Sequence, residues 1–345
     1  MKHNKFLFGL AAILLLTAAC NKQEPVLSVE QTVESVILTR AIGDKTPIVS
    51  VYVETNDVNP LNVLDYKIGR KYFIDVCELF AANIHKQTVN GNIEPTVYLN
   101  DKLTPILEGG LSTYVTPIKS VGTKVLLTML GDWQGIGLAN MNDTQQKQFA
   151  NILAWIVEKY KLDGIGFDDE YADYPFFPRP SAASYAGIIN YFKELCPDAM
   201  VNVFDYGGRT GSIDPTKVNY AFHGSFGQYM STSNIPELPV AKWSPMCFNL
   251  GLDNSLTTVE DYAADTKVSS YGAMMFFNIR TRTEKDALPV FQAAARGAYP
   301  GQNVSCVANG GNRPRTATPV PAGYTITNTA AKAGLQAAGK SFFNI

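Results

Sequence analysis

The stretch that decides the fold is LDGIGFDDE, residues 162–170, where the apolar run Leu162 to Phe167 passes directly into three acidic residues. An exposed acidic loop would hardly follow an apolar strand at once, so the run predicts a buried β-strand. Side chains two positions apart on a strand point to the same side, which places Asp168 and Glu170 together and turns Asp169 away. The stretch therefore predicts a strand that delivers two carboxyls to one pocket.

Similar apolar, β-branched runs recur along the chain and alternate with helical patterns. The expected strands are residues 48–54, 72–80, 124–130, 162–167, 200–204, 218–222, 243–248 and 271–277. Clear helical faces follow at 142–160, with Asn142 as cap, at 181–195 and at 284–296. Eight such units predict an α/β fold, a (β/α)8 TIM barrel. An open doubly wound sheet is the alternative, but no Gly-rich phosphate loop follows the first strand.

The ends of the chain differ in character from the predicted barrel, residues 47–298. Lys2, His3 and Lys5 precede the apolar run 6–16, and Thr17-Ala18-Ala19 lead into Cys20, a pattern similar to a bacterial lipobox. We expect a signal peptide over 1–20 that ends at an acylated Cys20, with plain secretion or an uncleaved anchor as alternatives. Residues 21–46 predict a polar tether. Residues 299–345, rich in Gly, Asn, Pro and Thr, predict a C-terminal extension that is either irregular or a small β addition.

Composition excludes several classes of function. Lys plus Arg number 29 and Asp plus Glu 31, a net charge of −2, and no basic stripe indicates nucleic acid as a partner. The remaining cysteines, Cys77, Cys196, Cys247 and Cys306, lack the spacing of a zinc site, so we expect no metal and no cofactor. Export permits disulfides, yet Cys77 and Cys247 lie in apolar runs, which favours buried free thiols.

The two carboxyls at the end of the fourth expected strand are the candidate chemistry. Crowding and burial raise a carboxyl pKa, which keeps a Glu protonated near neutral pH so that it can act as a general acid. A solvated acidic loop and a metal site are the alternatives, although a magnesium site would need more oxygen ligands than the sequence supplies. Catalytic carboxylates are the preferred interpretation of Asp168 and Glu170.

These residues resemble the signature of glycoside hydrolase family 18, D-G-x-D-x-D-x-E, with Asp163, Gly164, Asp168 and Glu170 in its places. The continuation DDEYA, residues 168–172, is similar to the endo-β-N-acetylglucosaminidase branch typified by endoglycosidase H. Flanking stretches match the same branch: FAANI at 80–84, LGDWQG at 130–135 and AN at 139–140. The similarity extends from about residue 72 to residue 174 and continues more weakly through the later strands.

The resemblance implies hydrolysis between the two core GlcNAc units of N-linked glycans, with retention of configuration and with the substrate's own acetamido group as nucleophile. Glu170 would protonate the leaving oxygen and then activate water. Asp168 would orient the acetamido group and stabilise the oxazolinium charge. A catalytically weakened glycan-binding protein on the same fold and a chitinase-like hydrolase are the alternatives.

Two positions depart from the family pattern. Gly166 stands where the family has the first carboxylate of its strand. We therefore expect weaker coupling between the pKa values of the carboxyls on that face of the strand, and a gain in turnover from Gly166→Asp. The usual acetamido-contacting Tyr falls at Ser225, and a shift of register would recruit Tyr206 or Tyr229 instead.

Further residues follow strand ends and are candidates for sugar contact: the aromatic residues Trp133, Tyr171, Tyr174, Phe176 and Phe177, and His223, with Asp205, Asn249 and Asn278 as weaker ones. Exposed aromatic faces suit sugar stacking, whereas packing is the alternative for each of them. His223 could equally be a hydrogen-bonded residue at a strand end.

The expected partners are N-glycans or glycoproteins and, through the lipid anchor, a membrane. Whole glycoproteins would not cross an outer membrane, so we expect a monomeric lipoprotein of the bacterial cell envelope, at the outer membrane and displayed on the cell surface. High-mannose, hybrid and complex glycans all remain open as substrates.

Overall fold

The computed structural model describes residues 45–177, 179–314 and 323–345. Nine parallel strands form a nearly closed barrel in the order β10-β9-β8-β7-β6-β4-β1-β12-β11. They are β1 (Ile48–Glu54), β4 (Val76–Val89), β6 (Lys124–Gly131), β7 (Gly164–Asp168), β8 (Met200–Asp205), β9 (Tyr220–His223), β10 (Trp243–Ser244), β11 (Cys247–Asn249) and β12 (Ala273–Phe277). The predicted α/β class and TIM-barrel-like architecture are confirmed, and each expected strand overlaps an observed one.

The seventh expected strand, 243–248, is divided into β10 and β11 at Pro245-Met246. Proline has no N–H to donate to a ladder, which explains the interruption. β10 pairs with β9 on one side of the barrel and β11 pairs with β12 on the other. Hydrogen bonds from Gly272 N to Trp243 O (3.2 Å) and from Met275 N to Met246 O (3.4 Å) link the two edges.

Strand parity separates two apolar layers. One set of side chains fills the inside of the barrel: Ile48, Tyr52, Val76, Leu126, Met200, Phe204, Phe222, Cys247, Ala273 and Met275. The alternate residues, such as Val49, Val51, Ile165 and Phe167, belong to a larger cluster shared with the helices. The inside of the barrel is therefore filled with side chains, as it is in (β/α)8 barrels.

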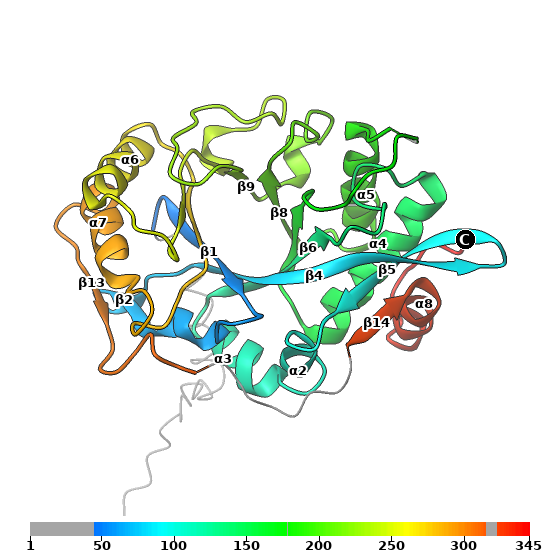
Figure 1. The fold of residues 1–345 in the computed structure, drawn as a ribbon, viewed down its shortest axis with the longest axis horizontal. Helices are drawn as coiled ribbons and strands as arrows, with labels where there is room; N and C mark the ends of the chain where they lie inside the picture. The colour runs from blue at the N-terminus through cyan, green and yellow to red at the C-terminus, as the bar shows by residue number, and fades with distance from the viewer. Residues whose placement is uncertain (1–44, 178, 315–322) are drawn as a thin grey trace, which may run out of the picture.

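Helices lie outside the strands (Figure 1). The long ones are α4 (Asp143–Tyr160), α5 (Ala182–Leu195), α6 (Leu256–Val268) and α7 (Leu288–Ala298). Asn142 caps α4 in a capping box with Gln145, and Ser181 caps α5, as the sequence predicts.

The ring of helices is incomplete. Between β1 and β4 the chain forms η1 (Pro60–Asp65), β2 (Tyr66–Ile68) and β3 (Lys71–Tyr72). The crossovers after β8 and β9 contain only the short η3 (Pro215–Lys217) and η4 (Val240–Lys242) among the described residues. The barrel thus departs from eight regular βα units.

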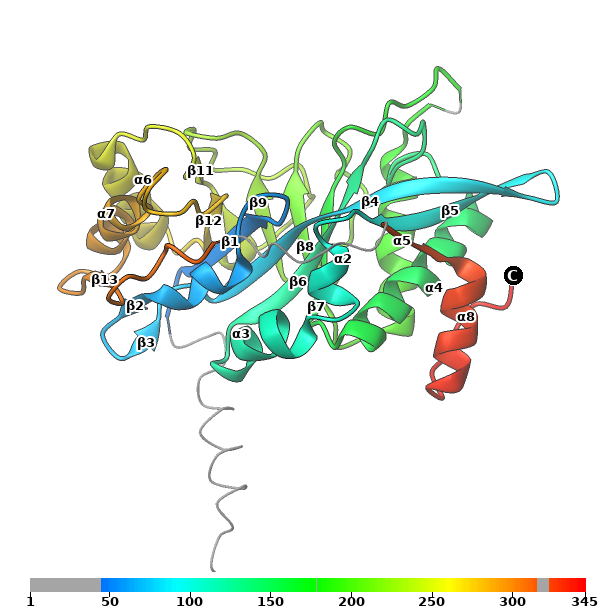
Figure 2. The same cartoon turned by 60° about the horizontal axis from the view of Figure 1, so that its bottom comes forward.

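The second expected strand, 72–80, is wrong at both ends. β4 runs on to Val89 and turns back as β5 (Asn92–Leu99), which forms the long arm seen in Figure 2. Asn90 (φ 52°) and Gly91 (φ 82°) make the turn, and Asn-Gly is the preferred dipeptide for a two-residue hairpin with both φ positive. Short α2 (Thr104–Leu107), η2 (Leu111–Val115) and α3 (Thr116–Ser120) lead back to β6.

The C-terminal extension contains regular elements where it is described, which agrees with the expected small β addition and not with the irregular extension. β13 (Val304–Cys306) pairs with β2, and β14 (Tyr324–Thr327) pairs with β5. The helix α8 (Asn328–Ala337) then packs on α4 (Figure 2).

The predicted signal peptide, the tether up to residue 44 and the lipidated Cys20 lie outside the described residues. Within the described part, no helix is long and apolar enough to cross a membrane, and no group of three His, Cys, Asp or Glu side chains could hold a metal ion. Cys77 and Cys247 are buried free thiols, as expected, and Cys196 and Cys306 are free as well.

Candidate active site

A cavity of about 410 Å³ opens at the carboxyl ends of the barrel strands. Both predicted catalytic carboxyls, Asp168 and Glu170, line it, together with side chains from β1, β4, β8, β11 and β12. The structure therefore brings the pair to the end of a barrel where such folds build their sites.

Asp168, the last residue of β7, is 2% exposed. Burial raises the pKa of its carboxyl well above the usual value, and the charges of Glu170, Asp169 and Glu78 raise it further. Its Oδ1 is buried and has no hydrogen-bond partner among the described residues. An unpaired buried oxygen costs about 1–3 kcal/mol, so this atom is poised to accept a hydrogen bond from a ligand.

Glu170 is half-buried in the cavity, and burial raises the pKa of its carboxyl. Its backbone is fixed by the chain that follows β6. Gly131 N donates to Glu170 O (3.1 Å), and Trp133 N donates to Tyr171 O (2.6 Å). A Cβ at Gly131 would lie 2.4 Å from Glu170 O, so only glycine permits this close approach.

Asp169 turns away from the cavity, as strand parity predicts. It accepts hydrogen bonds from the Tyr174 hydroxyl and from Arg209 Nη1 (3.2 Å). Burial raises the pKa of its carboxyl, while these two partners oppose the rise. Asp169 thus ties the loop after β7 to the loop after β8.

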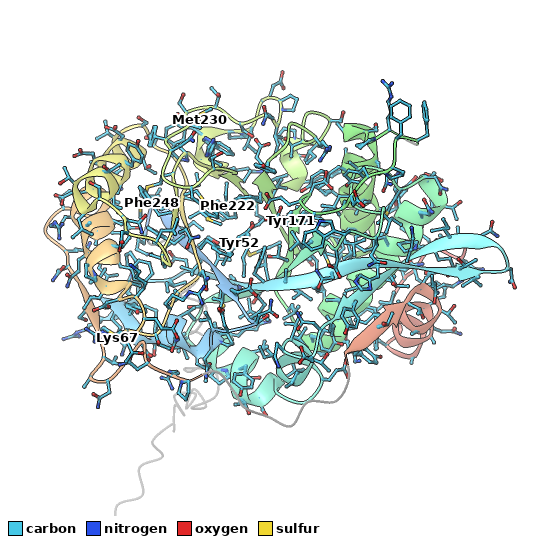
Figure 3. The ribbon with its side chains drawn as sticks, in the orientation of Figure 1. Tyr52, Lys67, Tyr171, Phe222, Met230 and Phe248 are labelled. Atoms are coloured by element: carbon cyan, nitrogen blue, oxygen red, sulfur yellow. The ribbon has the colours of Figure 1, made fainter. Side chains whose placement is uncertain are left out.

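Aromatic rings surround the two carboxyls. Trp133, 64% exposed, and Tyr171, 51% exposed, form a tilted pair with ring centroids 5.1 Å apart at the rim. The charge of Glu170 is the main cause that raises the Tyr171 pKa, and both side chains line the cavity. Further rings of the wall are Tyr52, Phe80, Phe204, Phe226 and Phe277. Figure 3 shows Tyr52 and Tyr171 near the middle of the strand ring.

A second, more polar cavity of about 480 Å³ adjoins the first, with which it shares Glu54, Asn249 and Phe277. Asn249 therefore faces both cavities. Asn278, buried and with φ 69°, lines the second cavity beside the guanidinium of Arg280. The two predicted asparagines consequently lie on a polar continuation of the carboxyl-bearing cavity.

Asp205 and His223 lie outside the residues that line these two cavities. The Asp205 carboxylate accepts hydrogen bonds from Thr210 Oγ1 (2.5 Å), Ser233 Oγ (2.7 Å) and Asn234 N (2.7 Å), so it organises a loop. His223 Nδ1 accepts from Ser225 N (3.1 Å), and burial lowers the His223 pKa.

The alternatives to Ser225 are placed differently. Tyr229 is packed against Tyr262 and Tyr271, with ring centroids at 5.2 and 6.4 Å, on the helical side of β11. Tyr206 is 45% exposed and stacks on Phe204 of the cavity wall, with centroids 6.3 Å apart. Of the two, Tyr206 lies at the rim.

Sequence reasoning missed three polar residues of the barrel interior. Tyr52 and Glu54 share the inward face of β1, and Glu78 of β4 lies deep inside the barrel. Alternation along the first strand could have indicated two of them. In the expected strand 48–54, the positions that face inward carry Ser50, Tyr52 and Glu54.

A parallel barrel that presents paired carboxyls in an aromatic-lined cavity defines a glycoside hydrolase. The chain is 30% identical over 239 residues to an endo-β-N-acetylglucosaminidase of Flavobacterium sp. strain SK1022, covering 66% of this chain and 74% of that one. It is 28% identical over 322 residues to endo-β-N-acetylglucosaminidase F1 of Elizabethkingia meningoseptica, covering 87% and 92%. No protein-family model matches the chain.

Among solved structures, Bacteroides thetaiotaomicron EndoBT-3987 with a Man5GlcNAc product superposes with a TM-score of 0.69 at 28% identity. The match covers 77% of this chain and 63% of that one. The chain belongs to the endo-β-N-acetylglucosaminidases of glycoside hydrolase family 18.

Proposed function

We propose that this protein hydrolyses the linkage between the two core GlcNAc units of N-linked glycans, with retention of configuration. The observation that carries the proposal is the pairing of Asp168, whose Oδ1 is buried and unpaired among the described residues, with the more accessible Glu170 in one cavity. The family and the aromatic rim agree with a sugar substrate.

The two carboxyls divide the work by their surroundings. The Glu170 acid protonates the leaving glycosidic oxygen while the acetamido oxygen of the substrate attacks the anomeric carbon, which gives an oxazolinium ion. Asp168 Oδ1 accepts the acetamido N–H and stabilises the positive charge. The Glu170 carboxylate then takes a proton from water as the water opens the ring, which restores the acid.

The substrate class rests on the relatives. EndoBT-3987 has been crystallised with a Man9GlcNAc2Asn substrate and with a Man5GlcNAc product. Trp133 and Tyr171 supply ring faces at the rim of the cavity, and Asn249 and Asn278 extend the surface toward the polar cavity. We propose these four residues as glycan contacts.

The test is to incubate the protein lacking residues 1–20 with a high-mannose glycoprotein and to weigh both products by mass spectrometry. The expected products are a free glycan ending in one GlcNAc and a protein that keeps the other. Glu170→Gln should abolish release, whereas Glu194→Gln, an exposed glutamate of α5, should not. Release by Glu170→Gln at the wild-type rate would refute the assignment.

A catalytically weakened glycan-binding protein is the second candidate, because Gly166 stands where the family signature has a carboxylate. Its distinguishing result is retained glycan binding without release at high protein concentration.

We further propose that the protein is a lipoprotein of the bacterial outer membrane, anchored at Cys20 and displayed on the cell surface. The lipobox-like stretch Thr17 to Cys20 supports this. Lys45 precedes the amino end of β1, whereas Glu170 follows the carboxyl end of β7, so the anchor would join the barrel at the end opposite the cavity. Fatty-acid labelling that persists in Cys20→Ala would contradict the anchor.

A further inference from the structure

The described residues include an acid inside the barrel that the proposed mechanism does not use. Glu78 of β4 has no exposed surface, 0%, and its carboxyl lies at the centre of a ring of polar side chains. Burying an ionised carboxyl costs free energy unless hydrogen bonds or opposite charges compensate for the lost water. The partners of Glu78 should therefore explain why it is buried here.

Three donors from three strands hold the Glu78 carboxyl. Asn202 Nδ2 of β8 donates to Oε1 at 2.8 Å, Thr128 Oγ1 of β6 donates to Oε2 at 3.2 Å, and Ser50 Oγ of β1 reaches Oε1 at 3.4 Å. Burial raises the Glu78 pKa to about 7 despite these donors. The carboxyl is thus fixed in position and not mobile in the cavity.

Glu78 occupies the space that Gly166 leaves empty on β7. A Cβ at Gly166 would lie 2.2 Å from Glu78 Oε2 and 2.9 Å from Thr128 Oγ1. Gly166, Asp168 and Glu170 share one face of the chain at intervals of two residues, so the Glu78 carboxyl lies at the start of that row. The same geometry argues against the expected gain from Gly166→Asp, because the new side chain would collide with Glu78 unless Glu78 moved.

We propose that Glu78 supplies from β4 the carboxyl that β7 lacks at Gly166, and that it acts as a positioning residue that governs the ionisation of Asp168. The inference rests on the proposed function for its catalytic consequence. The titratable groups that interact electrostatically with Glu78 are Asp168 of β7 and Tyr52 of β1, together with Cys77 on the opposite face of its own strand.

The consequence is electrostatic. Neighbouring carboxyls on one face repel one another when ionised, so the ionisation of each one depends on the charge of the others. An anionic Glu78 opposes the ionisation of Asp168, and a neutral residue in its place makes that ionisation easier. A carboxyl moved from position 78 to position 166 should restore the original coupling.

The experiment compares wild type, Glu78→Gln, Glu78→Ala/Gly166→Asp and its matched control Glu78→Ala/Gly166→Asn. For each, kcat/KM on a high-mannose glycopeptide is measured across pH. Glu78→Gln should move the acidic limb of the profile of kcat/KM against pH to lower pH by roughly one pH unit. The double variant that carries Gly166→Asp should return the limb to its wild-type position, and the double variant that carries Gly166→Asn should not. Asp65→Asn, a buried acid paired with Arg313, should leave the limb unchanged.

A second measurement does not depend on activity: the Asp168 pKa is followed by ¹³C NMR of Asp-labelled protein without substrate. Glu78→Gln should lower it. An unchanged Asp168 titration, or a wild-type acidic limb in Glu78→Gln, overturns the inference even if the double variants fail to fold. Wild-type protein that releases no glycan defeats the proposed function alone, because the titration still decides the role of Glu78.

Discussion

Asp168 and Glu170 lie two residues apart at one strand end, yet their surroundings differ. Both line the cavity, but Asp168 is almost fully buried in its wall, whereas Glu170 is only half-buried. Both pKa values are raised by burial, more strongly for Asp168. In the proposed mechanism the substrate's N–H meets the buried oxygen and its leaving oxygen meets the more accessible acid, so the difference in exposure supports the proposed division of roles.

Tyr171 follows the proposed acid Glu170 and lines the same cavity. Tyr171→Phe should lower kcat about tenfold with a smaller effect on KM, because the phenol interacts electrostatically with the Glu170 carboxyl. Tyr206→Phe, at the rim beside Phe204, is the matched control and should change kcat less than about threefold. Steady-state kinetics on one glycopeptide measure both. A larger loss in Tyr206→Phe would transfer the role to that residue.

The raised Glu78 pKa makes stability depend on pH. Its folded value is about 7 against 4.5 for the free side chain, so between these values the folded protein binds more protons than the unfolded chain. The Glu78 contribution to stability is therefore present below pH 4.5 and lost as pH rises to 7, a change of about 3 kcal/mol. Relative to wild type, Glu78→Gln should gain stability between pH 5 and pH 8 in urea unfolding. A constant difference would refute the buried titration.

Parity along residues 162–170 was enough to predict which carboxyls share the pocket and that Asp169 turns away. It could not predict Glu78, because the filling of the space beside Gly166 depends on a strand two places away in the sheet, beyond β6. The way the barrel closes decides which side chains from different strands meet inside it, and a local sequence pattern does not contain that information. The same limit explains why Asp205, at an equivalent strand end, turns instead to Ser233 and Asn234.

At the scale of elements, the segments after β6 and β7 remain paired beyond the strands. Hydrogen bonds join Gly131 to Glu170, Trp133 to Tyr171, and Gly135 to Ala172. This pairing carries the acid and both rim aromatics on one unit, so a disturbance in one segment reaches the other.

Gly131→Ala tests that coupling. The added Cβ would lie 2.4 Å from Glu170 O and 2.6 Å from Ala172 N, so the backbone that carries the acid must shift. We expect kcat to fall more than about tenfold, because small displacements of catalytic groups are costly. Gly208→Ala, where nothing lies within 4 Å, is a control for an added methyl in a site loop, although its φ of 71° adds strain. Wild-type kcat in Gly131→Ala would show that the segments are not coupled.

Elements were predictable where local chemistry decides them. The first strand has the expected bounds, and the caps Asn142 and Ser181 mark the true starts of α4 and α5. The β4–β5 arm extends beyond the expected strand, which ends with the apolar run at Phe80, although Asn90-Gly91 carries a turn signal. Pro245 likewise marks the division between β10 and β11.

At the scale of the molecule, the C-terminal extension braces the side of the barrel that carries the arm. β14 adds to β5, and α8 packs on α4, so strands and helices far apart in the sequence form one unit (Figure 1). The sequence could not predict this, because composition describes residues 299–345 without naming the surfaces that they cover.

The side chain of Asn151 connects α4 to the C-terminal extension. The side chain is fully buried, donates to Asn328 Oδ1 (2.9 Å) and Phe343 O (2.9 Å), and accepts from Phe343 N (2.8 Å). Asn151→Ala removes three hydrogen bonds and leaves their partners unpaired, so the free energy of unfolding should fall by about 3 kcal/mol. Asn190→Ala on α5, which loses one bond to Lys217, should cost less than about 1 kcal/mol. Because α8 lies on the helical side of the barrel, kcat should stay at the wild-type value in both variants. A loss of kcat in folded Asn151→Ala would mean that the extension acts on the cavity and not only on stability.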